Sequence, residues 1–178
     1  GEARSEYPSP SHGASFTSWP EQTSRPDRCA LTRQPPVIGW REWVRLVDLG
    51  DAVVKAKVDT GARTSALHAF ALEEFVRDDI SYARFEVHPV QRRSTPSIAV
   101  EIPITEWREI RNSGGKVERR PVVTTAIQLG ESRFPIDLTL TRRDEMGFRM
   151  LLGRHAARRR FLVDPGRSFR MGKPGSLP

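Results

Sequence analysis

The sequence has few of the residues on which several common kinds of site depend. Its only cysteine is Cys29, which excludes an internal disulfide and any zinc module built from cysteines. No His-Glu-x-x-His motif of a zinc peptidase is present. We therefore predict no metal site. His12 lies in a leading segment that we expect to be disordered, and we expect His68, His88 and His155 each to be a surface or packed residue.

Long apolar runs and several well-known motifs are also missing. No stretch is as long and apolar as a membrane span, and no signal peptide is recognisable, so we expect a cytoplasmic chain without a membrane partner. Gly114-Gly115-Lys116 lacks the other residues of a phosphate-binding loop, and no Gly-x-Ser-x-Gly occurs. We therefore predict no cofactor and no serine-hydrolase site.

Positive charge is in excess, since 29 Lys and Arg face 22 Asp and Glu and leave a net +7. Residues 142–170 alone hold nine arginines and three acids. A basic surface favours an acidic partner, although it can also serve only solubility. Because Arg158-Arg159-Arg160 has a single aromatic neighbour, Phe161, and nucleic-acid grooves combine cations with aromatic rings, we expect an acidic peptide and no nucleic acid.

The first 36 residues differ in composition from the rest. They hold six of the fourteen prolines and show no apolar period, so we predict that residues 1–36 are disordered. A partner-binding peptide around Phe16 and Trp19 is the alternative for this segment. We predict a folded domain over residues 37–172, long enough to bury a core, and a frayed tail over residues 173–178.

Alternating apolar residues predict many short strands in this domain, as is typical of an all-β barrel or sandwich. Asn112-Ser113-Gly114-Gly115 predicts the turn of a hairpin. One or two short helices complete the predicted all-β fold. The strands are expected at residues 43–47, 52–58, 82–88, 98–110, 116–125, 134–140, 148–152 and 161–164, and helical turns at 70–76 and 155–160.

One acidic loop follows a predicted strand directly. The strand 52–58 leads into Asp59-Thr60-Gly61-Ala62, and loops held by rigid strands often carry chemistry. Taken alone, Asp-Thr-Gly can also be an ordinary turn. A second feature lies near the C-terminus, where the apolar Met150-Leu151-Leu152 runs into Gly153-Arg154 and a short helix.

Together, Asp59-Thr60-Gly61-Ala62 and Leu152-Gly153-Arg154 resemble the two hallmarks of retropepsin-like aspartic peptidases. The chain is also similar to a bacterial branch labelled "ATP-dependent zinc protease", which is associated with ATP-grasp ligases that add glutamate to proteins. That similarity includes Gly39–Val44, Lys55–Ala69 and Asp144–Phe148. The resemblance covers about residues 37–172 and implies a retropepsin-like closed barrel that carries half of an acid-protease site.

The resemblance also implies roles for individual residues. Asp59 is expected to activate a water molecule, Thr60 to brace the loop through a hydroxyl hydrogen bond, and Gly61 to permit a close approach. Ala62 and Arg63, which follow in the loop, are expected to contact substrate.

Two further segments take roles from the same resemblance. The hairpin that turns at Gly114 and Gly115 lies where the family has a substrate-covering flap, and a plain exposed hairpin is the alternative. Gly153 and Arg154 are expected to be structural, and we expect Arg154 to pair with an acid such as Asp137 or Asp144.

Peptide hydrolysis by carboxylates needs two of them, and this chain has one Asp-Thr-Gly loop. We therefore predict a homodimer in which Asp59 meets its symmetry copy near the twofold axis. The predicted function is an aspartic endopeptidase acting on peptides or proteins, with glutamate-rich or ligase-modified tails as candidate substrates. The alternatives are a dimeric peptide-binding module that does not cut, and a zinc peptidase as the family label says.

Overall fold

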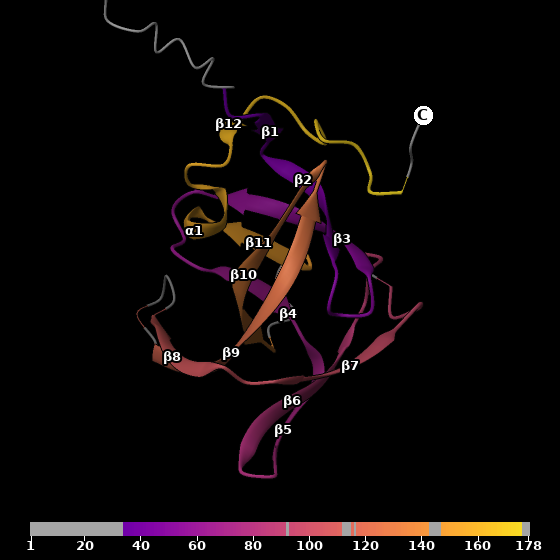
Figure 1. Ribbon diagram of the computed structural model, residues 1–178, viewed down its shortest axis with the longest axis vertical. Helices are drawn as coiled ribbons and strands as arrows, with labels where there is room; N and C mark the ends of the chain where they lie inside the picture. The colour runs from indigo at the N-terminus through magenta and orange to yellow at the C-terminus, as the bar shows by residue number, and fades with distance from the viewer. Residues whose placement is uncertain (1–33, 92, 112–114, 116, 143–146, 176–178) are drawn as a thin grey trace, which may run out of the picture. The chain divides into compact units, whose positions relative to one another are not determined.

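Strands make up nearly all of the regular structure, which confirms the all-β prediction (Figure 1). The computed structural model describes residues 34–91, 93–111, 115, 117–142 and 147–175. The strands are β1 Val37–Gly39, β2 Arg41–Leu46, β3 Ala52–Asp59, β4 Ser65–His68, β5 Phe70–Arg77, β6 Ile80–Val87, β7 Ile98–Pro103, β8 Glu106–Arg111, β9 Val117–Leu129, β10 Ser132–Thr141, β11 Met150–Gly153 and β12 Leu162–Asp164, and one helix, α1, spans Arg154–Ala157.

Six strands close into a barrel, as the resemblance implies. Their order is β10–β4–β11–β3–β2–β9, and β9 pairs back onto β10 to close the ring. On each strand alternate side chains point inward; in β3, for example, Ala52, Val54, Ala56 and Val58 are buried. This alternation fills the barrel with aliphatic side chains because successive residues of a strand face opposite sides.

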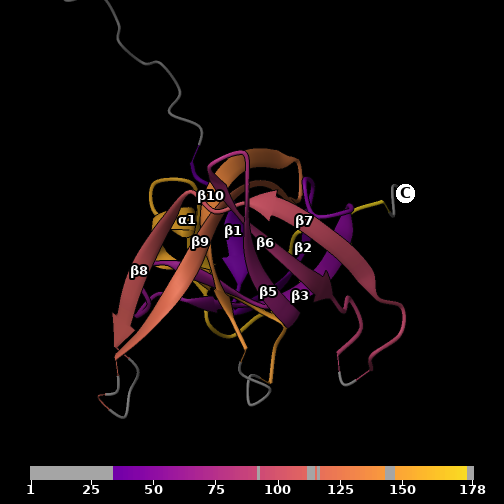
Figure 2. The ribbon, with the colours of Figure 1, turned by 90° about the horizontal axis from the view of Figure 1, so that it is seen from below.

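Three further strands, in the order β5–β6–β7, form a separate sheet below the barrel in Figure 1. Figure 2 views the chain from that end, with β5 and β6 in front of the barrel strands and with β8 beside β9 at one side. Ala83, Phe85 and Val87 of β6 are buried, as predicted for the inward side of that strand. No helix of the described residues is long and apolar enough to cross a membrane.

The prediction of helical turns at residues 70–76 was wrong, because this segment is the strand β5. β5 pairs with β6 through an irregularity between Phe70 and Glu73, and Phe75 stacks on Tyr82 with ring centroids 5.6 Å apart. The spacing of apolar residues in this segment resembles that of a helix, but pairing with β6 makes the segment a strand.

The predicted strand 98–110 was also wrong as a single element, since the chain changes partner in its middle. β7 ends at Pro103, which has no N–H to continue a ladder. The N–H of Ile104 then bonds the Ser81 carbonyl of the lower sheet, and the N–H of Thr105 bonds the Val122 carbonyl of the barrel. The segment therefore connects the two sheets. β8 and β9 do form the predicted hairpin.

A buried carboxylate ties the C-terminal segment to the barrel. Glu42 is fully buried, and it accepts backbone N–H groups from Gly39 at 2.6 Å, Arg170 at 2.9 Å and Met171 at 3.2 Å. Three donors compensate the loss of water around the carboxylate. In the predicted tail, Lys173 lies over the Trp43 ring at 5.2 Å, and residues 176–178 lie outside the described residues, as residues 1–33 do.

Candidate active site

Asp59 ends β3, at the point where the strand passes into an exposed loop. β11 runs parallel to β3, with Leu152 paired with Val58 and Gly153 paired with Asp59. The Asp59 Oδ1 accepts the N–H of Gly61 at 3.1 Å and the N–H of Ala62 at 3.0 Å. These two bonds fix the carboxylate in the turn, and the pairing of β11 with β3 confirms the predicted position of Asp59 beside Gly153.

Gly153 has no room for a side chain. A Cβ placed there lies 2.4 Å from the carbonyl carbon and oxygen of Thr64, and the N–H of Gly153 donates to the Ser65 Oγ at 3.0 Å. The strand β11 can therefore approach the loop only because this residue is glycine. Ser65 was not predicted as a site residue, and no sequence signal marks it, since its partner is 88 positions away.

The helix α1 holds the loop through its backbone. The N–H of Arg154 donates to the Ala62 carbonyl at 2.8 Å, and the N–H of His155 donates to the Arg63 carbonyl at 3.1 Å. The Arg154 Nη1 donates to the Thr60 carbonyl at 3.2 Å. The loop is thereby bonded at three carbonyls to Arg154 and His155. The helix is shorter than predicted because it ends at Ala157, before the left-handed Arg159 (φ 63°).

The expected pairing of Arg154 with Asp137 was wrong. Asp137 binds Arg108 of β8 at 2.9 Å and accepts the Thr124 hydroxyl at 3.2 Å, so its oxygens are already engaged. Burial opposes the charged form of Arg108, but its bonds with Asp137 and Glu106 raise its pKa above the ordinary value. Asp144, the other expected partner, lies outside the described residues.

A cavity of about 320 Å³ lies beside the loop, between α1 and the strands β8 to β10. Arg108, Asp137, His155 and Arg160 supply its charged and polar wall, and Asp59 does not line it. The volume is at the lower end of the range for small-molecule sites. The cavity therefore flanks the loop that carries Asp59 and is separate from the carboxylate.

The remaining predicted site residues are placed as follows. Thr60 is exposed, and its hydroxyl makes no hydrogen bond within the described part of the chain. A Cβ at Gly61 has ordinary contact with the Asp59 Oδ1 at 3.4 Å, so the close approach inside the chain occurs at Gly153 instead. Ala62 is half-buried and Arg63 is exposed.

The tip of the β8–β9 hairpin is described only at Gly115. This residue is exposed, with a φ of 81° and no atom within 4 Å of the position that a Cβ would take, so its conformation favours glycine. Gly114 lies outside the described residues. A substrate-covering role for the hairpin stays a prediction.

The buried histidines are packed against an aromatic ring. His68 and His88 stack on Phe70 with ring centroids 3.9 Å and 3.7 Å apart, and the phenyl ring separates them. The His88 Nε2 lies 3.0 Å from the Glu86 carboxylate. No group of three or more metal-binding side chains occurs among the described residues, and this donor set does not fit the zinc ion of the family label.

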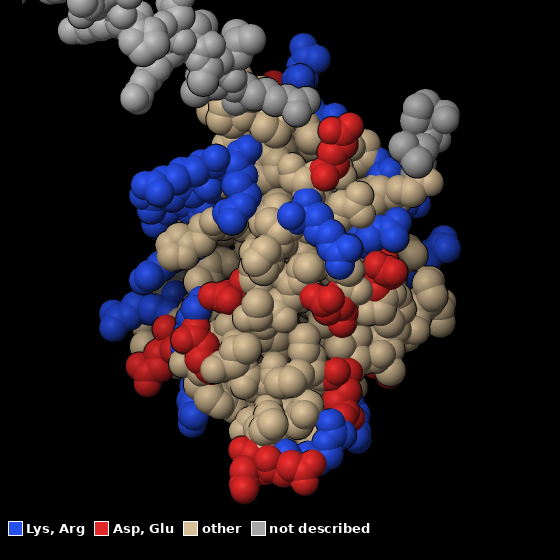
Figure 3. Space-filling model, viewed as in Figure 1, with Lys and Arg blue, Asp and Glu red and all other residues tan. Residues whose placement is uncertain are grey.

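Positive charge is concentrated near α1. Figure 3 shows Lys and Arg side chains gathered where Figure 1 places this helix. None of the exposed arginines of this cluster forms an ion pair with a carboxylate of the described residues. The cluster consists of Arg63, Arg154, Arg158, Arg159 and Arg160, and it borders the loop that contains Asp59.

Comparison with known proteins agrees with this geometry. A model of the RimB-like family, described as retropepsin-like aspartic endopeptidase RimB, matches residues 37–174. Two curated relatives are each named probable alpha-L-glutamate ligase: one from Parasynechococcus marenigrum is 48% identical over 136 residues, and one from Shewanella pealeana is 43% identical over 141 residues. These matches cover 76% and 79% of this chain but 29% and 31% of the relatives, so the chain spans about a third of their length.

A solved structure is also similar. The crystal structure of Lpg0085 from Legionella pneumophila, described as a protein with unknown function, has 31% sequence identity and a TM-score of 0.64. The match covers 76% of this chain and 98% of the Legionella protein. The fold is therefore that of a known bacterial domain.

Proposed function

The chain belongs to the RimB-like family of retropepsin-like aspartic endopeptidases, and on this premise we propose that it hydrolyses peptide bonds as a homodimer. The observation that carries the proposal is the loop of Asp59. Its carboxylate is held by the N–H groups of Gly61 and Ala62, and Gly153 lies directly beside it. One chain supplies one such carboxylate, so a twofold dimer completes the pair.

The proposed mechanism uses two Asp59 carboxylates that share one proton, because two such groups about 3 Å apart cannot both ionise easily. The ionised one accepts a proton from a water molecule as the water oxygen bonds to the peptide carbonyl carbon. The protonated one gives its proton to the carbonyl oxygen. The resulting diol then collapses, the C–N bond breaks, and the nitrogen leaves with a proton from the carboxyl pair. In this dimer, the hydroxyl of Thr60, which makes no hydrogen bond among the described residues, would find its bracing partner on the second copy.

Acidic protein tails are the substrate class we propose. The relatives' name describes a ligase for glutamate, and the matched segment makes up 29% and 31% of those polypeptides. A peptidase domain in the same polypeptide would meet glutamate-rich products. The arginines around α1, which form no ion pair with a carboxylate of the described residues, support an acidic substrate because they lie next to the loop of Asp59.

The test is cleavage of a protein that carries a glutamate tail. The Asp59→Asn substitution is nearly isosteric, so it should lower kcat/KM by at least about 10³-fold while the melting temperature stays unchanged. The matched control is Asp79→Asn at the distant tip of β5 and β6, which should keep full activity. Specific activity should also fall on dilution, as a dimer dissociates.

Two results would favour the alternatives. Cleavage that EDTA abolishes and zinc restores, in a protein whose Asp59→Asn variant still cuts, would support a metal-dependent peptidase. Tight binding of the tail that survives Asp59→Asn, with no cleavage by the unmodified chain, would support the non-catalytic binding module.

A further inference from the structure

A row of three side chains crosses the outer face of the barrel next to Asp59. Lys57 of β3 pairs with Arg41 of β2 on one side and with Leu151 of β11 on the other. Because side chains of β3 alternate, Lys57 and Asp59 lie on the same face, and residues two apart along a strand are separated by roughly 7 Å. Lys57 is therefore a cation on the same face of β3 as the proposed catalytic carboxylate, two residues before it.

The pair of Arg41 and Lys57 breaks an ordinary rule of sheet stability. Like charges placed directly opposite on neighbouring strands destabilise a sheet. Neither residue has a carboxylate within 4.0 Å among the residues that the structure describes, so no acid of this part of the chain relieves the repulsion. Local rules are most often broken at functional sites. The pair therefore has the charge pattern of a site for an external anion.

The surroundings fix one cation and leave the other accessible. The Arg41 guanidinium carbon lies 4.6 Å from the centroid of the Trp40 ring and 5.1 Å from that of Phe169, and its Nε donates to the Ser168 Oγ at 3.1 Å. These contacts fix the Arg41 guanidinium against Trp40, Phe169 and Ser168. Lys57 is exposed, so its ammonium group can reach a ligand placed over Asp59.

We propose that Lys57, with Arg41 beside it, determines specificity by binding the carboxylate of an acidic side chain next to the scissile bond. Leu151 is half-buried and provides an apolar surface for the methylene groups of that side chain. This inference rests on the proposed function, because it places substrate over Asp59. In a twofold dimer a second Lys57 lies on the other side of the site, so the acid is recognised on both sides of the cut bond.

Binding in the Asp59→Asn protein tests this assignment without relying on cleavage. Two labelled peptides of one sequence are compared, with either Glu-Glu or Gln-Gln at the centre. The Asp59→Asn protein should bind the Glu peptide about tenfold more tightly, since a charge-assisted hydrogen bond is worth about that factor. Adding Lys57→Met should reduce the preference to less than about twofold. Adding Arg84→Met, which removes an exposed cation of the lower sheet, should leave it tenfold.

Active protein supplies a second measurement. Lys57→Glu should reduce kcat/KM for the Glu peptide and raise it for a peptide with lysine at the same positions. An unchanged Glu preference in the Lys57→Met protein would overturn the proposal, and so would an equal loss in Arg84→Met. A Lys57 that only tuned the ionisation of Asp59 would give no Glu preference in the Asp59→Asn protein, because that substitution removes the ionising group. If the unmodified chain cleaves nothing, the binding comparison still decides the role of Lys57.

Discussion

Cations come together at two places in this chain, and among the described residues only one of these places holds a partner carboxylate. In the sheet β5–β6–β7, Arg77 and Arg84 both bind the Glu101 carboxylate, at 2.6 Å and 3.1 Å. On β2 and β3, Arg41 and Lys57 face each other, and no carboxylate of the described residues lies within 4.0 Å of either. In the lower sheet an acid of the chain itself holds the two cations together, whereas beside Asp59 we propose that an external anion does so.

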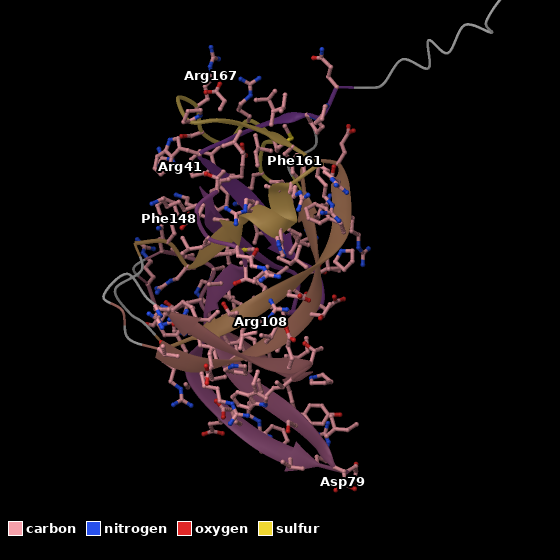
Figure 4. All side chains as sticks on the ribbon, turned by 90° about the vertical axis from the view of Figure 1, so that its left-hand side faces the viewer. Arg41, Asp79, Arg108, Phe148, Phe161 and Arg167 are labelled. Carbon is pink, nitrogen blue, oxygen red and sulfur yellow. The ribbon has the colours of Figure 1, made fainter. Side chains whose placement is uncertain are left out.

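These two regions are far apart in the fold, so each can be changed without the other. Figure 4 places Asp79 at the tip of the lower sheet, at the end opposite to Arg41. Substitutions at distant positions without shared partners usually have additive effects. The comparison can therefore be tested one region at a time.

The largest expected effect comes from disrupting the packing that supports the Asp59 loop. Gly153→Ala should lower the free energy of unfolding by about 3 kcal/mol or more, because the new Cβ meets the Thr64 backbone at 2.4 Å. Gly147→Ala is the matched control, since no atom lies within 4 Å of its Cβ position and its φ is not in the left-handed region. Urea unfolding of the two variants measures the difference, and equal midpoints would contradict the tight approach of β11.

A smaller effect sharpens the comparison of charges. Lys57→Glu should raise the free energy of unfolding, because it turns the like-charged pair with Arg41 into an attractive one. Arg84→Glu should lower the free energy of unfolding, because it turns the attractive pair with Glu101 into a like-charged one. Each change should be less than about 1 kcal/mol. Thermal unfolding at low salt shows both shifts most clearly, and added salt should reduce them. A decrease in stability for Lys57→Glu would mean that Arg41 and Lys57 do not repel each other.

The smallest effect concerns acid stability of the lower sheet. Hydrogen bonds from Arg84 and Arg77 hold the pKa of Glu101 below its ordinary value of 4.5. A carboxylate whose pKa is lowered by folding stabilises the folded chain at pH values above the pKa that it has in the unfolded chain. This stabilisation is lost as the pH falls through the pKa that it has in the folded chain. Glu101→Gln should therefore be less stable than the unmodified chain at neutral pH, and the difference should shrink as the pH falls below 4.5. Glu109→Gln, which removes a carboxylate without an ion pair among the described residues, should show no such trend.

Much of the fold could be predicted from the sequence because strand periodicity is a local signal. The strands that contain Val54 and Leu138 lie where apolar alternation predicted them, and so does the junction of β11 with α1. The segment that contains Phe75 was predicted to be helical, because its partner strand β6 and the stacked ring of Tyr82 enter only in the folded chain. Sequence patterns report which residues alternate, but not which strand they pair with.

In the candidate site, too, the features set by local sequence could be predicted, and those set by contacts between distant segments could not. Asp59 and Gly153 could be found from two short motifs, since each motif describes a local backbone shape. Arg154 was assigned the wrong partner, because its neighbour is a backbone carbonyl at Thr60, and carbonyl positions leave no mark in a sequence. Ser65 went unnoticed for a similar reason: its hydroxyl serves a backbone N–H that lies far along the chain.

The sequence by itself determined the β character, the acidic loop after β3 and the excess of positive charge, because these depend on residue type and short-range order. Only the tertiary structure decided which charges are matched. The registers of β2, β3 and β11 place Lys57 between Arg41 and Leu151, whereas β6 and β7 bring Arg84 to Glu101. Register is a property of paired strands: a shift by one residue would move every side chain to the opposite face, and the row beside Asp59 would not exist.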